Sequence, residues 1–138
     1  MDSLTQCINA SNSLYDDICN RPEILGKVKF APKERDTRFF RLEFIRPKKC
    51  VHRIYGLSIS FPTDAMGNRG LKYGEGFPST IETTLLGEIP QYSDIFDADS
   101  IYDENCGYSD VCRFFDTNSL VEEIVRISNY LSSTSARR

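Results

Sequence analysis

The stretch that decides the fold is Ile54-Tyr55-Gly56-Leu57-Ser58-Ile59-Ser60-Phe61, which is followed by Pro62. Large apolar side chains stand at every second position from Tyr55 to Phe61, and smaller residues fill most of the positions between them. A period of two is the pattern of a half-buried β-strand. Proline cannot donate the next hydrogen bond of a sheet, so Pro62 ends the element. The stretch predicts a strand with its Tyr55 face on a core.

Other segments on both sides of this strand repeat the period of two. Their apolar positions are Leu25, Val28 and Phe30, then Phe40, Leu42 and Phe44, and later Ile81, Thr83 and Leu85. A short strand is also predicted at 100–102 and a final edge strand at 111–115. Strands buried on both faces read as continuous apolar runs, so this alternation favours an antiparallel sheet with one covered face.

Helical spacing is found near the two ends of the sequence. Residues 3–20 predict a helix whose apolar stripe is Leu4, Ile8, Tyr15 and Ile18, with Ser11 as a gap, and Pro22 enforces its end. The closing helix carries a stripe of Leu120, Ile124, Ile127 and Leu131, widened by Val121 and Val125. Ser119 and Glu122 have the spacing of a capping box at its start.

This order of elements predicts the α+β class, with an antiparallel sheet of about four to six strands and the N-terminal and C-terminal helices packed on it. The 138 residues fit one domain, and 40% hydrophobic residues are enough for a core. Within it we expect an N-terminal helix at 1–22, a sheet at 23–116 and a C-terminal helix at 117–132. The sheet region contains a long loop at 63–79 and an acidic loop at 88–110.

The five cysteines are interpreted as reduced thiols, because none has C-x-x-C spacing and the core needs no disulfide staples. We expect no signal peptide, because the polar start lacks a basic residue followed by an apolar run. No apolar run is long enough to predict a membrane span. These features favour an intracellular, cytoplasmic protein that does not associate with a membrane.

Charge divides the chain into two halves. Residues 21–53 hold eleven Lys or Arg against four Asp or Glu, whereas residues 54–138 hold six against thirteen. Phe39 and Phe40 interleave with Arg38 and Arg41, as on surfaces that stack bases and bind phosphate. The candidate residues for an anionic partner are Lys27, Lys29, Arg38, Arg41, Lys48, Lys49 and Arg53. The alternative is that these cations pair with acids of the chain itself.

The sequence contains no recognisable catalytic motif. His52 is the only histidine, so thiol or serine chemistry would have to use it, and Cys50 is its nearest nucleophile. Cys50, His52, Cys106 and Cys112 lack the usual spacing of zinc ligands. We therefore assign no catalytic residue, no metal site and no cofactor.

A third of the chain resembles a known group of proteins. The resemblance rests on FPSTIETTLL at 77–86, IYD at 101–103, GYSDVCRF at 107–114, Leu120 and the pair Glu123-Ile124. These segments resemble small uncharacterised proteins of phages and large double-stranded DNA viruses. The resemblance implies a viral accessory protein that binds a host component and acts in the host cell, and it implies no catalytic residue.

The preferred hypothesis is a small non-enzymatic binding module for a protein partner, of the interaction or inhibitor type. Nucleic-acid or nucleotide binding by the basic segment 21–53 is the first alternative, and a small enzyme built on Cys50 and His52 is the second. A homodimer is an open alternative for the assembly.

Overall fold

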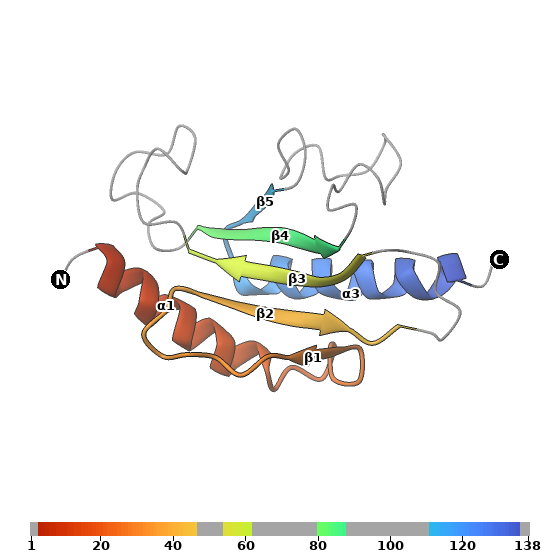
Figure 1. Ribbon diagram of the computed structural model, residues 1–138, viewed down its shortest axis with the longest axis horizontal. Coiled ribbons are helices and arrows are strands. Elements are labelled where there is room, and N and C mark those ends of the chain that lie inside the picture. Colours follow the sequence, from red (N-terminus) through yellow and green to blue (C-terminus); the bar gives the residue numbers. More distant parts are fainter. Residues whose placement is uncertain (1–2, 47–53, 62–79, 88–110, 136–138) are drawn as a thin grey trace.

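The computed structural model describes residues 3–46, 54–61, 80–87 and 111–135 of the chain. Figure 1 shows its elements, which in chain order are α1 (Ser3–Ile18), β1 (Val28–Phe30), β2 (Phe39–Phe44), β3 (Ile54–Ser60), β4 (Ile81–Gly87), β5 (Val111–Phe114) and α3 (Thr117–Ser135). The strands form one sheet in the order β1-β2-β3-β4-β5, and every neighbouring pair is antiparallel. The predicted α+β fold, with a sheet between two terminal helices in the sequence, is confirmed. The short strand predicted at 100–102 and the loops at 63–79 and 88–110 lie outside the described residues.

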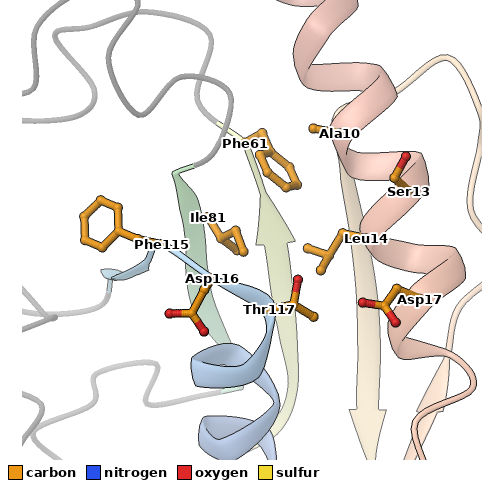
Figure 2. Close-up of a pocket in the computed structure, with 9 residues that line it drawn as sticks. All are labelled: Ala10, Ser13, Leu14, Asp17, Phe61, Ile81, Phe115, Asp116 and Thr117. Carbon is orange, nitrogen blue, oxygen red and sulfur yellow. The ribbon is translucent and has the colours of Figure 1, made fainter.

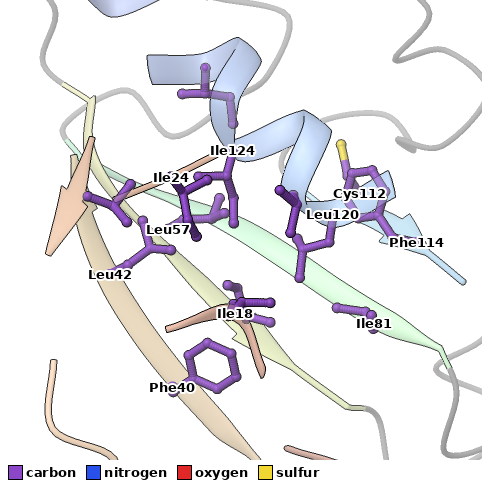
Figure 3. Packing of buried hydrophobic residues seen from close by; sticks show 14 of the residues in the cluster. Ile18, Ile24, Phe40, Leu42, Leu57, Ile81, Cys112, Phe114, Leu120 and Ile124 are labelled. Carbon is purple, nitrogen blue, oxygen red and sulfur yellow. The ribbon is translucent and has the colours of Figure 1, made fainter. Parts of the chain in front are cut away.

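The core lies between the two helices and one face of the sheet (Figure 3). On β2 the buried residues are Phe40, Leu42 and Phe44, as the alternation predicts. They share the core with Ile18 of α1 and with the stripe of α3, whose members Leu120, Ile124, Ile127 and Leu131 are all buried. The predicted stripe of the closing helix is therefore confirmed.

The first strand is shorter than the period of two predicts. Leu25 stands three residues before Val28, a spacing that does not fit a period of two, and it is 60% exposed and lies outside β1. Gly26 explains the difference, because its φ of 83° is in the left-handed region, which breaks an extended run. The strand starts after this turn.

The buried stripe of α1 also differs from the prediction. Its buried residues are Cys7, Ser11, Leu14 and Ile18, whereas Leu4 is 52% exposed. Ser11 is therefore not a gap in the stripe but lies in its centre. Tyr15 is half-buried beside this stripe, with its ring edge-on to the ring of Phe40 at 5.2 Å. A small residue such as Ser11 lets the helix come close to the core. A prediction that considers only apolar residues overlooks it.

The cap of α3 is Asp116 rather than Ser119. Asp116 Oδ1 accepts a hydrogen bond from the backbone N–H of Ser119 at 2.8 Å, and Oδ2 accepts one from the Ser119 hydroxyl at 2.9 Å. The helix begins at Thr117, so Ser119 occupies its third position. The capping-box prediction places the helix start three residues too late.

An irregularity in β3 moves Tyr55 to the face opposite the predicted one. The register shifts between Ile54 and Gly56, so Tyr55 is an extra residue without a partner in β4. Such a bulge reverses the alternation on one side of it. Ile54 is buried in the core, and Tyr55 is 45% exposed.

The cysteines do not all have the same state. Cys7 and Cys19 are free, and burial raises the pKa of both thiols. Cys112 is disulfide-bonded, so the interpretation of all five residues as reduced thiols is wrong for this position. Its partner lies outside the described residues, and no paired spacing in the sequence points to it. The cysteines therefore carry no argument for an intracellular compartment.

The helices of the described chain can also be compared with the length and hydropathy that a membrane span requires. None of the helices in the described segments has a stretch that is both long and apolar enough to cross a bilayer.

Candidate binding surface on the open face of the sheet

The second face of the sheet points away from the core. On β2, Phe39, Arg41 and Glu43 alternate with the buried residues and are all exposed. Lys29 of β1 is the register partner of Glu43. On the other side of β2, Gly56 pairs with both Glu43 and Leu86, which extends the face to β4. We use the name open face for the set Lys29, Phe39, Arg41, Glu43, Tyr55 and Leu86.

Both helices pack against the core, so neither covers the open face. In Figure 1, α3 passes behind the strands and α1 lies beside β1 and β2. Two large aromatic side chains are consequently exposed on the open face, Phe39 at 43% and Tyr55 at 45%. A single exposed aromatic residue is ordinary on a protein surface. Two of them on one face of a sheet, each lining a hollow of its own, are a feature of binding surfaces.

The charges of the open face differ from the other charges of the basic segment. Among the described residues, the side chains of Lys29 and Arg41 make no hydrogen bond and no ion pair, although both are exposed. Glu43 is the acid next to both cations, and Glu34 lines the hollow that Phe39 lines. Farther across this face, Arg113 of β5 and Glu82 of β4 form an ion pair with 3.3 Å between Nε and Oε2. Within the described sheet, the unpaired cations are therefore confined to β1 and β2.

Most other cations of the basic segment are used inside the molecule. Lys27 donates to Asn129 Oδ1 of α3 at 3.4 Å, and Arg38 donates to the Phe61 carbonyl at 3.0 Å. Arg35 forms a two-fold contact with the Asp16 carboxylate of α1 at 2.9 and 3.1 Å. That contact lowers the pKa of Asp16 and raises the pKa of Arg35.

The seven predicted binding residues thus fall into three groups. Lys29 and Arg41 lie together on the open face, whereas Lys27 and Arg38 make contacts elsewhere. Lys48, Lys49 and Arg53 lie outside the described residues. The basic segment is therefore neither one continuous surface nor wholly paired within the chain. Acids that pair with it in the described residues are Asp16 and Asp17 of α1, with Arg35 and Arg21, and Glu23 of the segment itself, with Arg21.

The open face contains two adjoining hollows. One of about 370 Å³ has walls of Tyr55, Leu86, Lys29 and Glu43. A second of about 290 Å³ lies beside Phe39, Lys33 and Thr37. Ala31, Pro32 and Arg41 line both, so Arg41 stands where the two hollows meet.

Gly56 lies between Glu43 and Leu86, its register partners, which both line the first hollow. A Cβ atom at this position would lie 2.5 Å from the Leu42 carbonyl oxygen and 3.4 Å from Leu86 Cδ1. No side chain fits there without moving β2 away from β3. The sheet surface between Glu43 and Leu86 is consequently bare backbone.

A further cavity of about 410 Å³ lies between α1 and the start of α3 (Figure 2). Leu14, Phe61 and Ile81 form its apolar part, and Asp17 and Asp116 stand at its polar side. Both carboxylates already have partners, because Arg21 donates to Asp17 and Ser119 donates to Asp116. This cavity lacks the unpaired charges of the open face, and we regard it as the weaker candidate.

The described residues contain no group of three or more His, Cys, Asp or Glu side chains that could hold a metal ion. Cys50, His52 and Cys106 lie outside the described residues, so the alternatives of thiol chemistry and of a zinc site stay predictions.

A scan against protein-family models, a search of curated proteins and a search of solved structures found no match for this chain. The resemblance of residues 77–124 to phage and viral proteins therefore stays a prediction.

Sequence reasoning identifies part of this surface. The alternation on β2 places Arg41 and Glu43 opposite the core, and the basic segment includes Lys29 and Arg41 as binding residues. Tyr55 and Leu86 are missed. The signal for Tyr55 is the neighbouring Gly56, because an isolated glycine in a strand pattern indicates a bulge or a close backbone approach.

Proposed function

We propose that this chain is a non-enzymatic binding module that binds a protein partner through the open face. The observation that supports this most is the pair Lys29 and Arg41, which have no partner among the described residues and stand beside exposed aromatic rings. Elsewhere on this face of the described sheet, Glu82 and Arg113 pair with each other, and Ser58, Ser60 and Thr84 carry no charge. The open face thus offers charges and rings whose contacts a partner would supply.

The mixture of side chains favours protein over nucleic acid. Protein interfaces combine an aromatic centre with charges of both signs at the rim. Glu43 is the register partner of Lys29 and lies two residues from Arg41 on the same strand face. A carboxylate between two cations weakens the binding of a phosphate backbone, which rewards many cations of one sign.

Nucleic-acid binding by the basic segment has less support for a second reason. Lys27, Arg35 and Arg38 are engaged with Asn129, Asp16 and the Phe61 carbonyl. A phosphate contact at any of these would have to replace an internal contact. The proposal of a viral accessory role, which comes from the resemblance at 77–124, agrees with a protein partner but adds no residue to the site.

Affinity isolation of the tagged chain from its source cells tests the proposal. The test variant is Phe39→Ser with Tyr55→Ser, and the matched control is Leu4→Ser with Leu25→Ser. All four are exposed large residues of the folded chain, and only the first pair is on the open face. We expect a stoichiometric protein partner that the control keeps and the test variant loses by about tenfold or more, as loss of two central aromatic contacts implies.

Two results would contradict the proposal. The first is a partner that the Phe39 and Tyr55 variant retains at the wild-type level. The second is a complex that nuclease digestion removes and that weakens steeply as salt rises, because counterion release on binding is the signature of phosphate contacts.

A further inference from the structure

The shape and charge of the open face specify one kind of partner segment. This inference rests on the proposed function, because it describes what occupies the same surface. We infer that the partner presents an extended acidic segment, in which one Asp or Glu binds Arg41 and a large apolar side chain on each side of it enters one of the two hollows.

The position of Arg41 places the acidic side chain. Arg41 lines both hollows and has no partner among the described residues, so its guanidinium is free to receive a carboxylate in two-fold geometry. Lys29 lines the first hollow and adds a second unpaired positive charge. Lys33, in the second hollow, is already used, because its ammonium donates to the carbonyls of Glu34 and Thr37. The demand for negative charge is therefore centred on Arg41.

The strand geometry sets the spacing. Phe39, Arg41 and Glu43 are successive outward positions of β2, and Phe39 and Glu43 line the second and the first hollow respectively. Residues two apart in a strand are separated by about 6.6 Å, so the two outer positions lie about 13 Å from each other. An extended peptide has the same rise, and its side chains at i, i+2 and i+4 share one face. The segment therefore reads apolar-x-acid-x-apolar.

The walls of the hollows explain the apolar positions. Tyr55, Leu86 and Pro32 supply apolar surface around the first hollow. Phe39 and Pro32 supply apolar surface around the second hollow. Aromatic and proline surfaces lose little conformational entropy when they bind, and pockets of this kind hold the anchors of an interface.

Selection from a phage-displayed library of random peptides on the full-length chain tests the inference. Selected peptides are counter-screened on the Phe39→Ser, Tyr55→Ser variant, so that only ligands of the open face remain. We expect these to be enriched in the apolar-x-acid-x-apolar pattern. Replacement of the central acid by its amide, Asp→Asn or Glu→Gln, should weaken binding about tenfold in fluorescence anisotropy, because a charge-assisted two-fold contact is lost.

Variants of the chain give a matched second measurement with the same peptides. Lys29→Glu combined with Arg41→Glu should weaken binding by more than about tenfold, because attraction becomes repulsion. Lys27→Glu also reverses a charge, by two units against four for the double variant, at a site two residues from Lys29. The Lys27 ammonium contacts Asn129 of α3, so affinity should stay within about twofold. Circular dichroism of each variant confirms that folding is intact.

The outcomes separate this inference from the proposed function. Peptides that require Phe39 and Tyr55 but carry no central acid would overturn the inference and leave the proposed function standing. A library that yields no ligand of the open face would count against both. Equal losses for Lys27→Glu and for the double variant would show a general charge effect and overturn the role of Arg41.

Discussion

The same strands form both faces of the sheet, but the described helices cover only one of them. On the face toward the helices, Phe40, Leu42 and Phe44 of β2 are buried against α1 and α3. On the other, Phe39, Arg41 and Glu43 of the same strand are exposed, and no described helix packs against them. Strand geometry alone sends neighbouring residues to opposite faces. Whether a residue of β2 is buried in the core or exposed on the open face therefore depends on whether its number is even or odd.

This contrast between the faces shows where polar groups are free to act. Cations near the helices bind residues of those helices, as Arg35 binds Asp16 of α1, and these contacts hold the elements together. On the open face, Lys29 and Arg41 have no such role. Substitutions on the covered face should therefore alter folding, and substitutions on the open face should alter binding with little change in folding.

The largest effect is expected for Leu42→Ala. Leu42 has no exposed surface, so truncation removes buried methyl groups and leaves a cavity, which costs about 2 to 5 kcal/mol. Phe39→Ala on the open face should cost less than about 1 kcal/mol, because its ring is half in solvent already. Urea unfolding measures both. Similar losses at the two positions would mean that the open face is covered in the folded protein.

A smaller loss of about 1 to 3 kcal/mol is expected for Gly56→Ala, since the added methyl group meets the Leu42 carbonyl and forces β2 and β3 apart. Ser58→Ala, two positions along the same strand face, is the control and should stay within about 0.5 kcal/mol. If both variants unfold at the wild-type urea midpoint, the inference that β2 and β3 lie too close at Gly56 for a side chain is wrong.

Asp116→Asn should have a weaker and pH-dependent effect. The hydrogen bonds from the Ser119 backbone and hydroxyl lower the pKa of Asp116. A lowered folded-state pKa gives stability that is present above the unfolded value of about 3.9 and is lost as pH falls through the folded value. The wild type should therefore be more stable than Asp116→Asn at neutral pH, and the difference should vanish under acid conditions.

Thermal unfolding from neutral to strongly acid pH measures this difference. Glu122→Gln is the control, because the capping-box spacing includes Glu122 whereas the structure caps α3 with Asp116. A larger loss for Glu122→Gln than for Asp116→Asn would support the capping box instead.

The smallest effect on folding is expected for Lys29→Glu combined with Arg41→Glu. Neither side chain has a partner within the described residues, and surface charges of this kind change stability by less than about 1 kcal/mol. Chemical denaturation of the double variant checks this value. A loss of several kcal/mol would indicate that these cations hold the chain's own acids, and the open face would not be a free surface.

Much of the fold follows from patterns that are local in the sequence. The alternation in β2 and β4 and the stripe of α3 are predicted at the right residues, because burial on one side imposes a period of two on strands and 3.6 on helices. Errors occur where a single residue changes the local geometry. Gly26 shortens β1, and the bulge beside Gly56 reverses the side of Tyr55.

By itself, the sequence determined the class of fold, the order of its elements and the outward direction of Arg41, because these depend on hydrophobic periodicity along short stretches. Only the tertiary structure decided which of the described cations are free. Lys27 contacts Asn129, and Arg38 contacts Phe61, across separations that no local pattern encodes. Charge composition counts all cations alike, whereas a hydrogen bond to a distant element depends on how the sheet and helices pack. The open face exists for the same reason, since both helices pack on one side of the sheet and leave the other uncovered by any described helix.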